Sequence, residues 1–268
     1  MLTISSHIRS VIVLFIIDKY KGLCYLYLCF VELRLILDVI FFYSMSENTD
    51  TKKINILIVF YTRYGNTARM AEEISAGAKE IPETNVTIKR IADDVPMDVI
   101  SKNLEWTKIV KDLDEKYPSS SIDELVNELP QYNAIIFGSP TRFGNMASQM
   151  KTLWDRTSRL WLNGSLIGKV GGVFTSASSV HGGQESTAIS MMFPMLHHGM
   201  IIVGVPYSIP ELTETGSPYS PSRIVGPKAD RPFEDKDIKV ARGFGKRIAE
   251  ITSKLVEKDK DKVSIKVS

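Results

Sequence analysis

This chain of 268 residues contains only two cysteines and has almost no net charge. The two cysteines, Cys24 and Cys29, lie near the N-terminus, outside every motif considered below. Their number and placement give neither a disulfide framework nor the ligand spacing of a zinc site. The 33 basic and 31 acidic residues leave a formal net charge of only +2. Such a balance provides no electrostatic footprint for nucleic acid and no acidic field that would attract a basic partner.

Two familiar phosphate-binding motifs are absent from the first strand-to-helix junction. Apolar residues from Ile54 to Phe60 predict a buried strand, and apolar positions from Met70 to Ile81 keep helical spacing. The loop between them, Thr62 to Thr67, lacks the Gly-Lys-Ser or Gly-Lys-Thr ending of nucleoside triphosphatases and the Gly-x-Gly-x-x-Gly pattern of dinucleotide sites. Helix N-termini attract anions, and the loop's hydroxyl and amide side chains can add hydrogen bonds. The loop therefore predicts a monophosphate site, with ordinary turn composition as the alternative.

The first 44 residues are apolar and differ in composition from the rest of the chain. The run Val11 to Ile17 is too short to span a bilayer and no small-residue cleavage site follows it. The longer run, Leu23 to Tyr43, carries the charged residues Glu32, Arg34 and Asp38. Each charge near the centre of a membrane helix costs about 2.5 to 3.5 kcal/mol, which opposes a stable span. We predict that residues 1–44 are an over-extended start and that translation begins at Met45. A membrane-associating helix is the alternative.

Strand-length apolar runs alternate with helical segments after Met45. Strands are predicted at Ile54 to Phe60, Val86 to Arg90, Ala134 to Gly138, Lys169 to Thr175 and Met200 to Val205. Helices are predicted at Ala68 to Lys79, Ser121 to Glu128, Met146 to Arg159, Gln184 to Leu196 and Glu234 to Val256. This alternation predicts an α/β fold with a doubly wound, five-stranded parallel sheet in the order 2-1-3-4-5. The domain covers residues 45–256, and residues 257–268 form a charged tail.

In this order, the turns after the first, third and fourth strands meet at one edge of the sheet. The turn Pro140 to Asn145 presents a hydroxyl, a guanidinium and an aromatic ring in succession, followed by a glycine that permits close backbone approach. The turn Ser176 to Gly183 consists mainly of small residues whose backbone N–H groups can face the carbonyl groups of a ligand. Each turn alone fits ordinary turn composition, but their joint occurrence predicts a pocket for a flat polar heterocycle.

Two segments exceed ordinary connections. Residues from Ala92 to Pro130 predict a helical excursion at the sheet edge, in which we identify no chemistry. Residues from Pro206 to Pro232 are rich in Pro, Gly and Ser, and their length far exceeds the usual loop of about 4 to 6 residues. We predict that this second segment forms a subunit interface near the ligand site, with a mobile loop as the alternative.

Six segments, taken together, resemble a known family. They are Thr62 to Thr67, Pro140 to Asn145, Leu160-Trp161, Gly182 to Glu185, His197 to Met200 and Gly216 to Tyr219. In order along the chain, they resemble the WrbA family of flavodoxin-like NAD(P)H:quinone oxidoreductases. The resemblance implies a flavodoxin-like fold, FMN as cofactor, NADH or NADPH as co-substrate and a quinone as substrate. It also implies a cytoplasmic homotetramer whose flavin sites are built by more than one subunit, with membrane contact confined to residues 1–44.

The resemblance also assigns residues to the cofactor by position. The FMN phosphate would be held by Thr62, Arg63, Tyr64, Gly65, Asn66 and Thr67. The flavin ring would be bordered by Thr141, Arg142, Phe143, Gly144 and Asn145, and its pyrimidine edge by Ser176, Ala177, Ser178, Ser179, Val180, His181 and Gly182. His198 resembles a histidine that contacts the flavin region, while Tyr64 and Trp161 resemble residues near the nicotinamide or quinone. Without the resemblance, His198 fits a helix-capping role and Trp161 fits core packing.

The implied reaction is a two-electron reduction of quinones. Hydride would pass from the nicotinamide to flavin N5, after which a quinone would take the same place, in a ping-pong exchange. Backbone amides would stabilise the developing charge, so no catalytic acid or base and no metal ligand is predicted. The alternative is a flavodoxin-type electron-transfer protein without its own substrate turnover; a flavin-containing scaffold protein is a second. Electron shuttles of this kind are short and strongly acidic, whereas this chain is near neutral.

Overall fold

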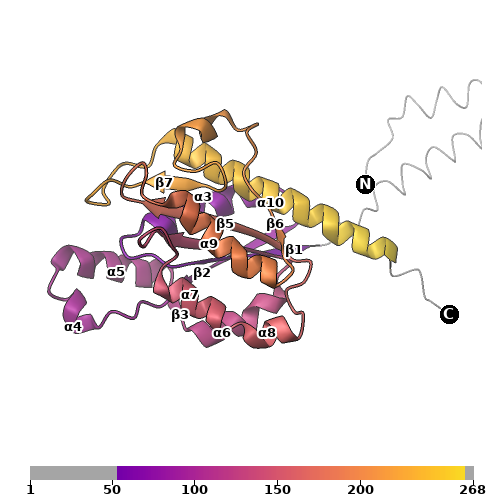
Figure 1. The fold of residues 1–268 in the computed structure, drawn as a ribbon, viewed down its shortest axis with the longest axis horizontal. Helices are drawn as coiled ribbons and strands as arrows, with labels where there is room; N and C mark the ends of the chain where they lie inside the picture. Colours follow the sequence, from indigo (N-terminus) through magenta and orange to yellow (C-terminus); the bar gives the residue numbers. More distant parts are fainter. Residues whose placement is uncertain (1–52, 263–268) are drawn as a thin grey trace, which may run out of the picture. The chain divides into compact units, whose positions relative to one another are not determined.

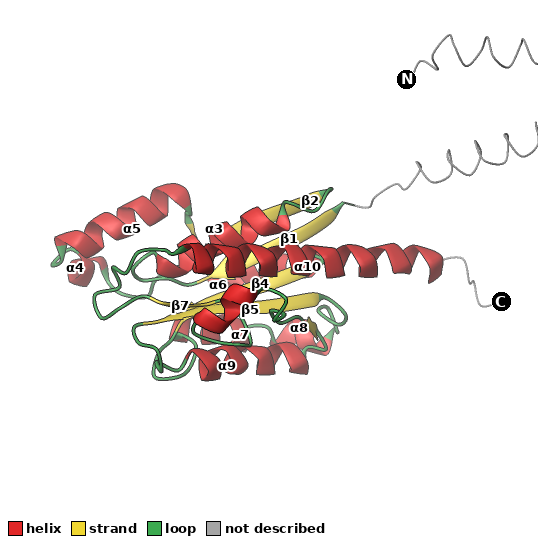
Figure 2. Cartoon of the chain, turned by 90° about the horizontal axis from the view of Figure 1, so that it is seen from above, coloured by secondary structure: helices red, strands yellow, loops and turns green. Residues whose placement is uncertain are grey.

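The computed structural model describes residues 53–262, in which a parallel β-sheet lies between two layers of helices (Figure 1, Figure 2). The strands of this part of the chain are β1 (Ile54–Phe60), β2 (Thr84–Ile91), β3 (Ser119–Ser120), β4 (Ala134–Pro140), β5 (Val170–Ala177), β6 (Ile201–Ile202) and β7 (Ser222–Ile224). They follow the order β3-β2-β1-β4-β5-β6, with β7 also paired to β5. The five predicted strands correspond to β1, β2, β4, β5 and β6, so the predicted order 2-1-3-4-5 is confirmed.

Two short strands share the edge of the sheet beside β5. β6 pairs with the first two residues of β5, and β7 pairs with its last three. The strand expected at Met200 to Val205 is therefore shorter than predicted, and the chain leaves the sheet before Pro206, which has no N–H to donate to a ladder. The chain returns as β7, so the intervening segment starts and ends beside β5.

Helices cover both faces of the sheet. On one face pack α3 (Asn66–Ala78) and α10 (Asp235–Lys262); on the other pack α6 (Ile122–Glu128), α7 (Ser148–Asp155) and α9 (Gln184–His197). The shorter elements are α4 (Met97–Ile100), α5 (Leu104–Lys116), α8 (Ser158–Leu162), η1 (Leu129–Gln131) and η2 (Pro210–Glu214). Figure 1 shows α4 and α5 as the helical excursion predicted after β2. The helix predicted at Met146 to Arg159 is divided into α7 and α8, and α10 continues past Val256 into the segment expected to be a charged tail.

The central strands are apolar on both sides, as a sheet covered on both faces requires. Along β1, Ile56 and Ile58 point into the core shared with α3 and α10, whereas Leu57 and Val59 point into the core shared with α6, α7 and α9. β4 and β5 alternate in the same way. The apolar runs that predicted these strands therefore supply both cores at once.

The predictions for residues 1–44 and for a start at Met45 fall outside the residues that the structure describes. Within residues 53–262, none of the helices combines the length and the apolar character needed to cross a membrane.

Glycine permits a close crossing of α3 and α10 on the first face. A Cβ atom on Gly245 of α10 would collide with the backbone carbonyl oxygen of Ile74, and one on Gly77 of α3 would collide with that of Arg242. The two backbones therefore approach so closely that each glycine faces the main chain of the other helix. This crossing fixes α3 on the sheet and hence the position of its N-terminus.

The substitution Gly245→Ala is expected to lower the free energy of unfolding by about 1 to 3 kcal/mol, because the new methyl group overpacks a contact between two backbones. Gly243→Ala is the matched control in the same helix, since its methyl group would meet only the end of the Ile209 side chain. Both substitutions gain the same helix propensity, about 1 kcal/mol. Urea unfolding followed by circular dichroism measures the difference. A Gly245→Ala variant as stable as Gly243→Ala would contradict this account of the crossing.

Candidate functional site

The first loop, residues 61–65, leads directly from the end of β1 into the N-terminus of α3. Gly65, the N-cap residue, has a left-handed backbone with φ of 80°, and no side chain of the described residues caps the helix. A Cβ atom on Gly65 would have no described atom within 4 Å, so the space beside it is open. The uncapped N–H groups and the positive dipole end of α3 therefore make an electropositive position open to an anion.

Hydroxyl groups surround the base of this loop. Thr62 and Thr67 are both buried, and the Thr67 Oγ1 atom lies 3.5 Å from the Oγ atom of Ser176 at the end of β5. The predicted first and third loops are thus joined at their bases. Tyr64 is half exposed at the rim of the first loop.

The guanidinium of Arg63 contacts residues that were not predicted to belong to the site. It lies 4.0 Å from the carboxylate of Asp93 and 5.0 Å from the centre of the Trp106 ring, which belongs to α5. Asp93 also accepts a hydrogen bond of 3.1 Å from the Tyr61 hydroxyl. Burial, followed by the nearby Asp93 carboxylate, raises the pKa of Tyr61 to about 12, so this hydroxyl stays protonated. The excursion in which we identified no chemistry therefore contacts the first loop.

The second loop, residues 141–145 after β4, is a tight turn with an exposed aromatic ring at its tip. Arg142 and Asn145 exchange backbone hydrogen bonds of 2.8 and 3.0 Å, and the two residues between them, Phe143 and Gly144, have φ values of 52° and 76°. Positive φ at both central positions is the type I′ geometry. A left-handed backbone costs a non-glycine residue roughly 1 to 2 kcal/mol, yet the Phe143 side chain is fully exposed. The turn therefore projects an aromatic ring away from the protein at an energetic cost.

The third loop, residues 178–183, packs against the second. The buried side chain of Gln184 donates hydrogen bonds of 2.7 and 3.1 Å to the carbonyl oxygens of Ser179 and Val180. A Cβ atom on Gly183 would lie only 2.7 Å from the Cα atom of Gly144 in the second loop. The two loops therefore form one wall. Gln184 was not among the predicted site residues, although the Gly-Gly-Gln-Glu segment that carries it was part of the resemblance.

Thr141 ties this wall to the sheet. Its backbone N–H donates to the carbonyl oxygen of Ser176 at 2.8 Å, and its hydroxyl lies 3.0 Å from that of Thr187 in α9. Loops one, two and three thus meet at the carboxyl edge of β1, β4 and β5. Ala177 ends β5 as a buried residue, while Ser178, His181 and Val180 are exposed at the rim.

His198 and Trp161 lie at the opposite edge of the sheet. His198 directly follows α9, three residues before β6, which pairs with the start of β5. The His198 Nε2 atom lies 2.8 Å from the Thr157 hydroxyl, which in turn donates to the Trp154 carbonyl oxygen. Trp161 is in α8, one turn beyond Thr157, and is half exposed. One copy of the chain therefore brings His198 and Trp161 near each other, but not near the three loops.

The environment of His198 favours its neutral form. Because the Thr157 hydroxyl donates to a carbonyl, its oxygen accepts a hydrogen bond from His198 Nε2–H, and Nδ1 is buried without a hydrogen-bond partner among the described residues. Burial, followed by the neighbouring His197, lowers the pKa of His198 below its ordinary value. A second ring proton would be buried without an acceptor.

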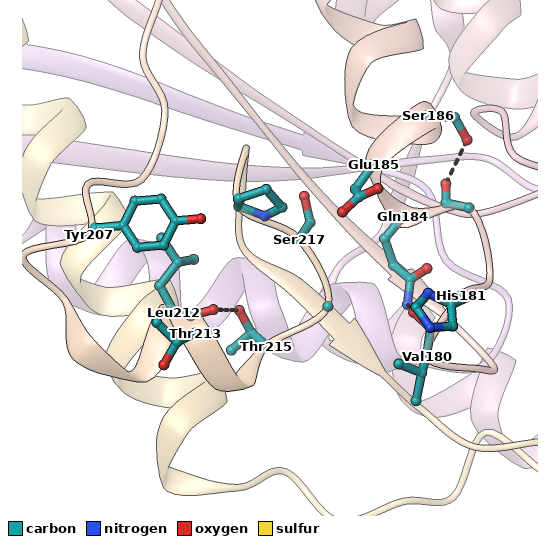
Figure 3. Close-up of a pocket in the computed structure, with 13 residues that line it drawn as sticks. Val180, His181, Gln184, Glu185, Ser186, Tyr207, Leu212, Thr213, Thr215 and Ser217 are labelled. Carbon is teal, nitrogen blue, oxygen red and sulfur yellow. Dashed lines mark hydrogen bonds between the residues drawn. The ribbon is translucent and has the colours of Figure 1, made fainter.

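A hollow of about 450 Å³ lies beside the third loop (Figure 3). Its walls are the third loop and the start of α9 on one side and the segment 207–218 on the other. Figure 3 shows Tyr207, Ser217 and Glu185 around the opening. The segment predicted to lie near the ligand site thus borders the third loop. Among the described residues, no group of three or more His, Cys, Asp and Glu side chains is arranged to hold a metal ion.

The chain is similar in sequence and in fold to known proteins. Residues 56–213 match the family model described as NADPH-dependent FMN reductase. A protein of Chromohalobacter salexigens named NAD(P)H dehydrogenase (quinone) is 41% identical over 205 residues, which cover 75% of this chain and 98% of the relative. A protein of Geotalea daltonii with the same name is 42% identical over 211 residues, covering 76% and 98%. The crystal structure of a WrbA-like flavodoxin from Agrobacterium tumefaciens has the same fold, with a TM-score of 0.52, 24% identity and coverage of 75% and 98%.

The lowered pKa of His198 predicts a loss of stability in acid. Because the folded protein binds the proton of His198 less tightly than the unfolded chain, the stability is fully present above the unfolded value of 6.5 and decreases as the pH falls through it. One proton gives a slope of at most about 1.4 kcal/mol per pH unit. His198→Gln, which cannot titrate, should remove this part of the pH dependence, whereas the exposed control His197→Gln should keep most of it. Equal pH dependence in all three proteins, measured by urea unfolding between pH 5 and 8, would refute this assignment.

Proposed function

We propose that this chain, which belongs to the NADPH-dependent FMN reductase family, is an FMN-dependent NAD(P)H dehydrogenase that reduces quinones. Relatives with this name match three quarters of the chain and nearly their own whole length. The observation that carries the proposal is the meeting of the uncapped α3 N-terminus with the second and third loops at one sheet edge. A flavodoxin-type electron carrier, the alternative, is not favoured by these relatives.

The residues at this edge fit FMN. The phosphate group would be held by the first-turn N–H groups of α3 and by the hydroxyls of Thr62 and Thr67, since the space beside Gly65 is open. The flat ring would lie against the second and third loops, with Thr141 and Arg142 at its border. The small residues of the third loop would let backbone N–H groups approach ring carbonyl oxygens.

Bound FMN supplies the two-electron chemistry, and the protein binds and orients it. The Gln184 side chain holds the carbonyl oxygens of Ser179 and Val180 and so fixes the path of the third loop. Fixed backbone donors cost no reorganisation when negative charge develops on a ligand. The fully exposed Phe143 ring offers an apolar surface beside the ring site. No acid or base side chain is required in this scheme.

We further propose a homotetramer in which Trp161 and His198 of one subunit complete the flavin site of another. Two observations support this. Both residues lie at the sheet edge opposite the three loops, so they cannot reach the loops of their own chain. The surface near them also exposes a group of large apolar side chains, which suits a protein interface: Trp161, Leu162, Ile167, Phe193 and Leu196. A cytoplasmic location, where NADH and NADPH are supplied, is part of the proposal.

Turnover tests the proposed function. The purified full chain should bind FMN and give a yellow protein, and should oxidise NADH or NADPH rapidly only when benzoquinone is added. Under steady-state conditions, a ping-pong reaction gives parallel lines in double-reciprocal plots. FMN binding without quinone-dependent oxidation would favour an electron carrier, and absence of FMN binding would contradict the whole proposal.

Mixing two inactive variants tests the shared site. Thr67→Val alters the phosphate end of the flavin site, and Trp161→Ala removes the residue from the opposite edge. If both lower activity at least about tenfold when alone, unfolding and reassembling them together should restore activity, because about one quarter of sites in random tetramers combine an intact loop with an intact Trp161. A mixture no more active than its components would show that each site belongs to one subunit.

A further inference from the structure

A buried arginine lies behind the phosphate end of the proposed flavin site. Arg223, on β7, exposes only 3% of its surface. It donates through Nη1 to the Oδ1 atom of Asn66, the first residue of α3, and through Nη2 to the carbonyl oxygen of Arg231. Its Nε atom lies 3.7 Å from the carboxylate of Asp237 in α10. Arg223 therefore connects the start of α3 to the segment that leads into α10.

This contact occupies the side chain of Asn66. Its Oδ1 atom accepts from Arg223, and its Nδ2 atom donates to the carbonyl oxygen of Ala229 at 2.9 Å. The sequence predicted that Asn66 would hold the phosphate through its side chain. In the structure both ends of that amide are already bonded within the chain. Asn66 can therefore serve the phosphate through its backbone N–H, with Arg223 and Ala229 fixing its position.

The charges around the start of α3 are unusual for a helix N-terminus. Helix N-termini favour acidic side chains, yet the first turn of α3 holds none and ends in Arg69. The guanidinium of Arg223 lies 4.6 Å, and that of Arg69 lies 5.1 Å, from the centre of the Phe233 ring. One aromatic ring thus holds two cations of like charge close to the same helix end.

Acidic groups offset only part of this charge. Asp237 is close to Arg223, and Glu234 is paired with Arg231 at 2.7 Å. Burial raises the pKa of Asp237, and the pKa of Arg223 is lowered by burial while Arg69 and Arg231 lie near enough to repel its charge. Three arginines thus face two carboxylates around the start of α3, and one of these carboxylates, that of Glu234, is also paired with Lys236 at 3.1 Å. The cation within the first loop, Arg63, is instead directed to Asp93 and Trp106.

We propose that Arg223 is a positioning residue for the phosphate group of the flavin: it holds Asn66 at the start of α3 and adds a buried positive charge behind the phosphate. The inference rests on the proposed function, since it presumes that the flavin phosphate lies at the start of α3. In this account the affinity for the phosphate comes from backbone N–H groups, from buried hydroxyls and from a charge that does not itself touch the ligand. A purely structural arginine would stabilise the fold without distinguishing ligands by their charge.

Riboflavin, which is FMN without the phosphate, separates these two roles. The flavin-free full chain is titrated with FMN and with riboflavin, and each dissociation constant is measured from quenching of flavin fluorescence. In Arg223→Gln the affinity for FMN is expected to fall about tenfold, because a charge near a helix N-terminus and its hydrogen bond are lost together. The affinity for riboflavin should change less than about threefold, since the ring wall is built by other loops.

Arg242→Gln is the control. Arg242 also ties α10 to α3, through an ion pair of 2.7 Å with Glu73. That contact lies seven positions beyond Asn66, about 10 Å further along the helix. Arg242 is half exposed, so its substitution is milder, but this variant loses the same charge and a tie between the same two helices. It should keep the wild-type ratio of riboflavin to FMN dissociation constants.

The ratio decides the outcome. A fall of at least about threefold in this ratio in Arg223→Gln, with no change in Arg242→Gln, would support the inference. An unchanged ratio, or equal weakening of both flavins, would overturn it. Should Arg223→Gln fail to unfold cooperatively, Arg223→Lys decides, because lysine keeps the charge but cannot reproduce the planar fork to Asn66 and Arg231; a fall of about threefold is then expected and an unchanged ratio overturns the inference. A wild-type chain that binds neither flavin would contradict the proposed function itself.

Discussion

The parallel pairing of β1, β4 and β5 is the constraint on which the site depends. Hydrogen bonds of the sheet continue past the strand ends into the loops: the N–H of Tyr61 donates to Gly138, and that of Thr141 donates to Ser176. The bases of the three loops are therefore fixed relative to one another by backbone groups, whatever their side chains do. The close glycine crossing between α3 and α10 then sets where the start of α3 meets these loops.

Fold and loop positions could be predicted because local patterns and general rules decide them. Apolar runs marked β1, β4 and β5, and right-handed crossovers leave few possible orders, so three loops had to converge. Contacts between distant residues could not be predicted in this way. The bond from Asn66 to Ala229 joins residues 163 positions apart, and Trp106 reaches Arg63 from a helix outside the matched motifs. No local pattern indicates that a particular side chain is already occupied.

The position of His198 and Trp161 was not predicted, for a different reason. The resemblance grouped them with the loop residues, and it says nothing of which copy of the chain provides each group. α9 runs back from the carboxyl edge before β6 begins, so a residue that directly follows α9 must lie at the other edge. The division of the last strand into β6 and β7 was equally hidden, since two of the three residues of β7 are polar and the strand lies within a Pro- and Gly-rich segment. Topology, rather than composition, decides both.

The second loop suggests how ligand binding and assembly are linked. Phe143 has a left-handed backbone and a fully exposed ring, so the isolated chain bears both backbone strain and the exposure of an apolar ring to water. At the opposite edge of the sheet, the apolar residues near Trp161 are likewise exposed to water. If one subunit covers the three loops of another, the flavin and the covering subunit contact the same surface. Each then stabilises the conformation of the loops to which the other binds. Thermodynamic linkage then requires that flavin strengthen the assembly by the same factor by which assembly strengthens flavin binding.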